Sequence, residues 1–204
     1  KEEIENIWPD REFSVLLDDS VQDMNIPLFW EFNFTGQGIK VAILDTGINK
    51  NHPMLEGKVI LEKDFSKSIS TNDGLGHGTH IAGIVAGNGQ YKGVAPDVQI
   101  LNGKVLSDSG FGRESYIING INWAVENNAD IISLSLGGPY PEINSPISNA
   151  LRDAIDNGVV VVAASGNCGN GCPSSSCRGY TGVTTPGNTE EIITVGAVDD
   201  NKNI

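Results

Sequence analysis

Three apolar runs recur along the chain, and each one ends in small or polar residues. They span Val41–Gly47, Ile131–Gly138 and Val159–Asn167, and Val98–Leu106 is a fourth segment expected to be a strand. Continuous runs of apolar, largely β-branched residues are typical of parallel strands that are buried on both faces of a sheet. The pattern therefore predicts that these four segments form the centre of a parallel sheet.

Between these runs, apolar residues recur at the spacing of a helix. They do so over Ser115–Asn128, with Ser115 as the expected N-cap, and over Ser145–Asn157, which Gly158 should end. A helix of small residues is expected over Ile81–Gly87. The alternation of strands and helices predicts an α/β fold, with a doubly wound, mostly parallel sheet and helices on both faces.

Length and charge narrow the range of functions. The 204 residues are 39% hydrophobic, which is enough for one sizeable core. The formal net charge of −13 argues against nucleic acid or an anionic membrane surface as a partner, since both are bound by clustered Lys and Arg. No apolar run approaches the ~20 residues that a membrane-spanning helix needs, so we expect no membrane span.

Three polar residues stand where such a fold gathers its ligands. Asp45 and Asn167 stand at the carboxyl ends of the first and last runs, and His77, within Gly76–His80, stands at the start of the small-residue helix. The carboxyl ends of parallel strands meet at one edge of a sheet, where ligands bind. A histidine there can act as a general base, although a histidine that merely caps a buried helix fits the same residues.

Taken together, these motifs resemble the subtilisin family of serine proteases. Asp45–Gly47, Gly76–His80, Ser135–Gly138 and Gly166–Asn167 stand in the family's order and near its spacing, and the resemblance runs from about Trp30 to the last residue. It implies a subtilisin-like fold and serine endopeptidase activity through an Asp-His-Ser triad. Asp45 would orient His77, His77 would be the general base, and Asn167 would donate its amide to the oxyanion.

The resemblance also implies a polypeptide substrate and the segments that bind it. Backbone around a glycine-rich turn pairs with an extended substrate, and two strand ends form the walls of a pocket. An ordinary glycine turn is the simpler interpretation of Gly110–Gly112. The expected substrate-binding residues are Gly110, Phe111, Gly112, Ser135, Leu136, Gly137, Gly138, Ala164, Ser165 and Gly166.

The family's serine motif does not occur in this sequence. The family places it in a Gly-Thr-Ser-Met-Ala helix start downstream of Val195–Val198, and the sequence ends at Ile204 without any Gly-Thr-Ser. Three interpretations fit: a fragment of a longer protease, one chain of a two-part protease, or an inactive pseudoprotease that serves as a peptide-binding or regulatory module. The intact Asp45, His77 and Asn167 favour the first two interpretations.

Two expectations follow from the missing serine. The chain alone should be inactive, and a complementary C-terminal fragment or second chain should supply the nucleophile. Residues 21–204 would then be the N-terminal two thirds of a catalytic domain, with its sheet incomplete at the C-terminal end. Residues 1–20 would be the tail of a prosegment or another N-terminal extension.

The cysteines suggest a compartment. Cys168, Cys172 and Cys177 fall within one loop, so at most one internal disulfide can form and one thiol is left over. A zinc site on three thiolates is the alternative, although the spacing matches no common zinc motif. A disulfide favours an oxidising compartment, so we expect a secreted or cell-surface protein rather than a cytoplasmic one.

The resemblance implies no cofactor for the chemistry but allows a structural calcium ion, at a site the sequence does not fix. The family commonly uses the aspartate of a His-Pro-Asp-Leu segment as a calcium ligand, and here Met54 replaces it. A thioether does not bind a hard cation that requires oxygen ligands. Asp64, Asp73 or the Asp199–Asp200 pair could serve another site, or they could be solvated surface carboxylates.

Overall fold

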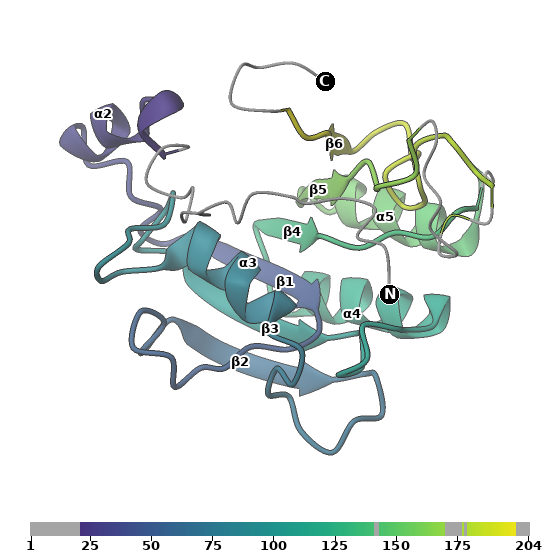
Figure 1. The fold of residues 1–204 in the computed structure, drawn as a ribbon, viewed down its shortest axis with the longest axis horizontal. Coiled ribbons are helices and arrows are strands. Elements are labelled where there is room, and N and C mark those ends of the chain that lie inside the picture. Colours follow the sequence, from purple (N-terminus) through teal and green to yellow (C-terminus); the bar gives the residue numbers. More distant parts are fainter. Residues whose placement is uncertain (1–20, 141–142, 170–176, 178, 199–204) are drawn as a thin grey trace, which may run out of the picture.

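A computed structural model describes residues 21–140, 143–169, 177 and 179–198, and its described part contains a six-stranded parallel sheet (Figure 1). The strands are β1 Lys40–Asp45, β2 Val59–Asp64, β3 Gln99–Lys104, β4 Ile131–Leu134, β5 Val160–Ala164 and β6 Ile193–Val195. The helices are α2 Ile26–Glu31, α3 His77–Ala86, α4 Glu114–Glu126 and α5 Pro146–Asp156. The strands lie in the order β2-β3-β1-β4-β5-β6, so the α/β prediction is confirmed.

Strand β1 separates two apolar cores. Val41 and Ile43 pack in a cluster with Ala82 and Ala86 of α3. The alternate residues of β1 pack in a second cluster with α4 and α5, which cover the opposite face of the sheet (Figure 1). Because successive side chains of a strand point to opposite faces, a strand between two helical layers must be apolar throughout. This explains why β1 appears in the sequence as an unbroken apolar run.

The structure differs from the sequence-based expectation in several elements. The four predicted strands correspond to β1, β3, β4 and β5, whereas β2 and β6 were not predicted. The expected capping role of Ser115 is wrong, because α4 begins at Glu114 with Arg113 as its N-cap. Ser145 does cap α5, since its hydroxyl oxygen accepts a hydrogen bond from the Ser148 N–H at 3.3 Å.

One of the three cysteine pairings is present. Cys168 and Cys177, which are nine positions apart in the sequence, form a disulfide. Three sequence expectations concern segments outside the described residues: the N-terminal extension 1–20, the third cysteine Cys172, and the Asp199–Asp200 pair.

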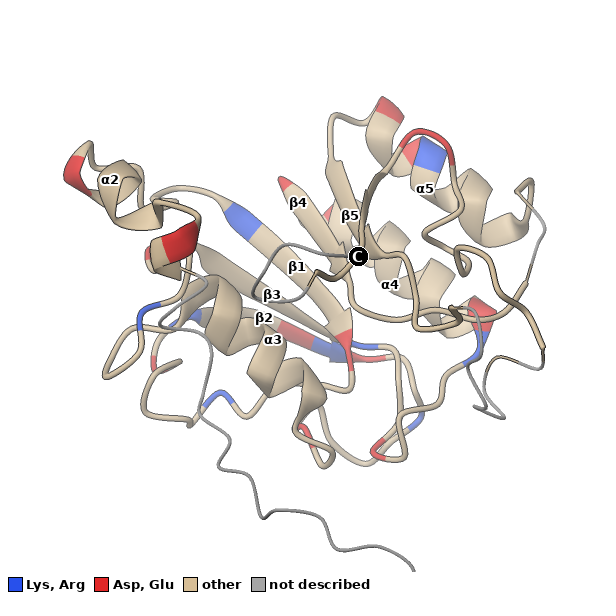
Figure 2. Ribbon diagram, turned by 45° about the horizontal axis from the view of Figure 1, so that its top comes forward, with Lys and Arg blue, Asp and Glu red and all other residues tan. Residues whose placement is uncertain are grey.

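The charged positions are dispersed over the fold. Figure 2 shows Lys and Arg spread over several strands, α5 and the loops, and Asp and Glu spread over helices, strands and loops alike. In the segments that the structure describes, no helix combines the length and apolarity required to cross a bilayer.

Helix α4 packs very close to the sheet because glycine occupies the contact points. A Cβ at Gly103 on β3 would lie 2.5 Å from Leu44 Cδ2, and one at Gly120 on α4 would lie 2.6 Å from Val105 Cγ1. Contacts below 3 Å cannot be accommodated without displacing the neighbouring side chain. Gly120 therefore lets α4 lie close to Val105, and Gly103 leaves room for the Leu44 side chain of the neighbouring strand, which lies beneath α4.

This packing yields a prediction about stability. Gly103→Ala should lower the free energy of unfolding of the full-length protein by about 1–3 kcal/mol, because the added methyl group overpacks the core. Gly83→Ala is the matched control, since a Cβ there meets no atom within 4 Å and Gly83 lies inside α3. The control should raise stability by about 0.5–1 kcal/mol through helix propensity. Urea unfolding measures both changes, and a Gly103→Ala protein as stable as wild type would contradict the packing argument.

Candidate active site

Asp45 ends β1 with its side chain almost completely buried, at 1% exposure. Its Oδ1 atom accepts a hydrogen bond from the Thr46 N–H at 2.7 Å and lies 2.7 Å from His77 Nδ1. A carboxylate can only accept, so Nδ1 carries the proton and donates a hydrogen bond to Asp45. This fixes the imidazole tautomer and leaves Nε2 as the basic atom of the ring.

His77 is the first residue of α3, and its side chain is 44% exposed. The preceding Gly76 has a φ of +97°, which a residue with a side chain rarely adopts. At Gly78 a Cβ would lie 2.2 Å from the Gly47 carbonyl oxygen and 3.2 Å from the Asp45 side chain. The Gly-His-Gly sequence therefore lets α3 start against the end of β1, which brings the two side chains together.

Asp73 organises the loop that leads into α3. Its Oδ1 accepts hydrogen bonds from the Thr46 hydroxyl and from the backbone N–H groups of Leu75 and Gly76. Its Oδ2 accepts from the N–H and the hydroxyl of Thr79 at 2.8 and 2.7 Å. Burial alone raises the pKa of Asp73, but the hydrogen bonds from Thr79, Gly76 and Thr46 lower the pKa below its ordinary value. The carboxylate is thus ionised at neutral pH.

A cleft of about 1090 Å³ opens beside His77. Leu75, Leu106, Phe111 and Ile117 give it apolar surface, and Phe111 is 77% exposed. The complete set of lining residues is Thr46, Leu75, His77, Leu106, Gly110, Phe111, Gly112, Arg113, Glu114, Ile117, Ser135, Leu136, Gly137, Gly138, Pro139, Tyr140, Asn144, Ser145, Pro146, Ile147, Thr185 and Pro186.

Most of the residues singled out from the sequence meet at this cleft. His77, all of Gly110–Gly112 and all of Ser135–Gly138 line it. Asp45 lies behind His77 rather than in the wall. Ala164, Ser165, Gly166 and Asn167 are not among the lining residues.

Thr184 and Thr185 lie between the two segments expected to be pocket walls. Thr185 and Gly138 exchange backbone hydrogen bonds, and the Thr184 N–H donates to the Ser165 carbonyl at 2.9 Å. A Cβ at Gly137 or Gly166 would lie within 2.3 Å of the Thr184 hydroxyl oxygen. Sequence reasoning missed this segment, whose only local signal is the turn-forming Pro186-Gly187 pair.

The described residues do not fit the family's calcium site. The Met54 side chain lies near Gly87 and Gly89, and its carbonyl oxygen accepts a hydrogen bond from the Asn88 N–H, so this position supplies no carboxylate. Asp73 already accepts five hydrogen bonds from the protein, which saturates its two oxygens. Within 21–140, 143–169, 177 and 179–198, no three His, Cys, Asp or Glu side chains gather as a metal site.

The Asp73 contacts predict how stability depends on pH. The folded pKa lies below the unfolded value, so the carboxylate stabilises the fold above about pH 4, and this contribution disappears as the pH falls through the folded pKa. Asp73→Asn points an amide NH₂ at protein donors and should cost about 2 kcal/mol at pH 6. Its deficit should shrink below pH 4.

Urea unfolding of the full-length protein between pH 3 and pH 6 measures this difference. Asp153→Asn, an exposed change on α5, is the matched control and should leave stability within about 0.5 kcal/mol of wild type. An Asp73→Asn deficit that is the same at every pH would contradict the assignment of a charged Asp73.

Comparisons with known proteins agree with this geometry. The Subtilase family profile matches residues 36–204. The chain is 41% identical over 193 residues to the major intracellular serine protease of Bacillus subtilis (strain 168), which covers 89% of this chain and 58% of that protein. It is 44% identical over 178 residues to subtilisin DY of Bacillus licheniformis, covering 83% of this chain and 60% of that protein.

A third relative is named as an extracellular protease, unlike the intracellular one above. The minor extracellular protease Vpr of Bacillus subtilis (strain 168) is 40% identical over 193 residues, which cover 89% of this chain and 23% of that protein. The chain thus spans less than two thirds of the length of each of these relatives, and their names include both an intracellular and an extracellular protease. With the family profile covering 169 of its 204 residues (36 to 204 inclusive), the chain belongs to the subtilase family.

Proposed function

We propose that this chain is the N-terminal part of a serine endopeptidase, in which Asp45 and His77 activate a serine supplied by a downstream segment or a second chain. The observation that carries the proposal is the 2.7 Å contact between His77 Nδ1 and the buried Asp45 Oδ1 at the rim of a large cleft. Subtilase membership and the serine protease names of the relatives support the same chemistry.

The residues divide the reaction among them. His77 Nε2 takes the proton of the serine hydroxyl as the oxygen attacks the peptide carbonyl, and it later gives that proton to the leaving amine. Asp45 holds the ring and stabilises the imidazolium that forms. The side-chain amide of Asn167 donates a hydrogen bond to the oxyanion of the tetrahedral intermediate.

The cleft supplies the binding surface for an extended polypeptide in this proposal. Gly110, Gly112, Gly137 and Gly138 lie along it without side chains, and Phe111, Leu75 and Tyr140 add exposed apolar surface. Gly112 also has a packing role, because a Cβ there would lie 2.4 Å from the Val105 carbonyl oxygen. Backbone pairing together with apolar side-chain contacts is a common mode of peptide recognition.

The exposed edge of the sheet at β6 is evidence that a further segment packs against it. Strand β6 is the last in the sheet order, and Ile193, Val195 and Val198 are 51–59% exposed. An exposed apolar edge strand offers unpaired backbone groups and apolar surface to another segment. We assign this edge to the segment that carries the serine, with an interface of about 2,000 Å² or more if that segment is a separate chain.

We also propose that the protein is secreted or lies at the cell surface. The Cys168–Cys177 disulfide supports it, because such bonds persist in oxidising compartments.

One prediction of this proposal concerns which parts of the protein are needed for activity. Residues 1–204 alone should not hydrolyse a fluorogenic peptide, because His77 has no serine to activate, whereas the protein with its downstream segment should. In the complete protein His77→Ala should abolish turnover. His80→Ala should not, since His80 is exposed on α3 and has no side-chain contact with Asp45.

Two results would contradict this prediction. Turnover by residues 1–204 alone would show that no further segment is needed. A complete protein that binds peptides without cleaving them would favour the peptide-binding module over the enzyme.

A second prediction tests the role of Asn167. Asn167→Ala should lower kcat by about 10²–10³-fold, the range known for loss of an oxyanion-hole amide, with KM little changed. Asn149→Ala, at an exposed position on α5, is the matched control and should leave kcat unchanged. Steady-state kinetics on one peptide measures both, and an Asn167→Ala enzyme with wild-type kcat would remove this residue from the mechanism.

A further inference from the structure

Lys104 is a fully buried lysine that none of the chemistry above uses. It ends β3, where it pairs in register with Asp45 on the neighbouring strand, and its exposure is 0%. Burial of an ammonium group costs several kcal/mol unless the charge is paired and its hydrogen bonds are made. The buried Lys104 ammonium group beside β1 therefore needs contacts that compensate the cost of its burial.

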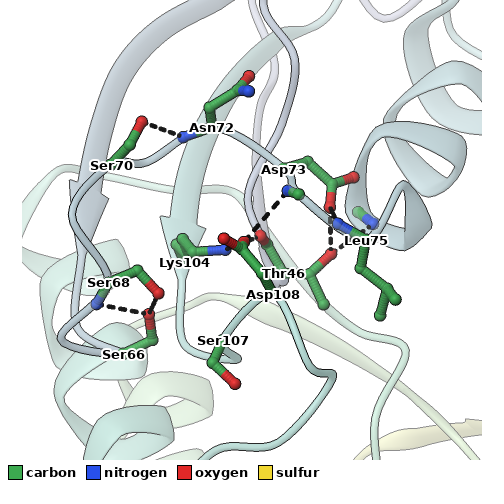
Figure 3. A network of polar contacts seen from close by, with 12 residues as sticks. Thr46, Ser66, Ser68, Ser70, Asn72, Asp73, Leu75, Lys104, Ser107 and Asp108 are labelled. Carbon is green, nitrogen blue, oxygen red and sulfur yellow. Dashed lines mark hydrogen bonds and ion pairs between the residues drawn. The ribbon is translucent and has the colours of Figure 1, made fainter.

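Those contacts lead to the two segments that carry Asp45 and His77. Lys104 Nζ donates to the Thr46 carbonyl oxygen and to Asp108 Oδ1, the latter at 2.6 Å. Figure 3 shows Lys104 beside Asp108 and Thr46. The Asp108 oxygen that Lys104 contacts also accepts a hydrogen bond from the Gly74 N–H at 3.1 Å, three residues before His77. One carboxylate oxygen thus connects the buried cation to the loop that leads into α3.

Thr46 joins this contact to the catalytic pair. Its N–H donates to Asp45 Oδ1, the oxygen that His77 also contacts. Its hydroxyl donates to Asp73 and accepts the Gly78 N–H at 3.0 Å. With its carbonyl held by Lys104, every polar group of this buried threonine is engaged.

We propose that Lys104 and Asp108 are positioning residues for the Asp45–His77 pair: the ion pair fixes the Thr46 carbonyl on one side and the Gly74 N–H on the other. The inference rests on the proposed peptidase function, since it assigns the pair a role in that reaction. Neither side chain touches the substrate in this account. They act by holding the two segments whose relative placement sets the 2.7 Å Asp45–His77 contact.

Two further observations fit the role. The hydrogen bond from Lys104, followed by that from the Gly74 N–H, lowers the pKa of Asp108, so Asp108 is ionised at neutral pH. A Cβ at Gly74 would lie 2.5 Å from the Asp108 carboxyl carbon, so a side chain there would displace the carboxylate from its present position. The loop before His77 is therefore built around the Asp108 carboxylate.

The test uses three variants of the complete protein. Asp108→Ala removes both contacts, Asp108→Asn keeps an oxygen acceptor for Lys104 and Gly74, and Lys104→Met removes the cation at similar length. Small displacements of catalytic groups cost up to about 10²-fold in rate. We expect Asp108→Ala and Lys104→Met to lower kcat about 10- to 100-fold with KM within about twofold, and Asp108→Asn to retain kcat within about threefold.

The matched control is a second ion pair of the same length. Lys50 Nζ lies 2.6 Å from Glu62 Oε1, as Lys104 Nζ does from Asp108, but this pair lies on the surface at β2. Glu62→Ala should leave kcat unchanged. Asp108→Ala leaves the buried Lys104 ammonium without its carboxylate partner, so the double variant of Lys104→Met and Asp108→Ala, which buries no unpaired charge, is measured beside it. Thermal unfolding verifies that each variant folds.

A spectroscopic readout separates this inference from the proposed function. The proton between His77 Nδ1 and Asp45 gives a low-field NMR signal that does not depend on turnover. We expect Asp108→Ala to shift or broaden it and Asp108→Asn to preserve it. An inactive wild-type protein would overturn the proposed function alone. A folded Asp108→Ala protein with wild-type kcat or an unchanged signal would overturn the positioning role, as would equal losses in Asp108→Asn and Asp108→Ala.

Discussion

The hydrogen bond between Asp45 and His77 requires the end of a buried strand and the start of a helix to approach within side-chain reach. That approach is possible because Gly78 has no Cβ where the Gly47 carbonyl lies, and because Gly76 adopts a left-handed conformation before the helix. Asp73 then ties the connecting loop to Thr46. The site thus depends on a close backbone contact that a side chain at Gly78 would obstruct, and on a backbone conformation that a side chain at Gly76 would strain.

Much of the fold and the catalytic pair could be predicted from the sequence, because their signals are local. β1 is buried on both faces and is therefore a continuous apolar run, and the Gly-His-Gly segment marks a helix start with room for close contact. Other features depend on partners distant in sequence. β2 has a mixed burial pattern that local periodicity does not distinguish from a loop, and Thr184 acquires its place from contacts with Gly137 and Gly166.

The polar network around Lys104 illustrates the same limit. A lysine at the end of an apolar run looks like a solvated strand end, and its burial follows only from the packing of β3 between β1 and β2. Asp108 and Asp73 likewise look like surface carboxylates until Gly74 and Thr79 are placed beside them. Their roles arise from tertiary contacts, in which buried charges are compensated by one another and by backbone donors.

The central claim is that Asp45 and His77 form the acid–base part of a triad whose serine lies beyond residue 204. Labelling of the complete protein with a fluorophosphonate probe, followed by mapping of the modified peptide, tests this most directly. The account predicts stoichiometric modification of one serine downstream of Ile204, lost when His77 is replaced by alanine. Modification of a serine within residues 1–204, or no modification of the folded complete protein, would contradict it.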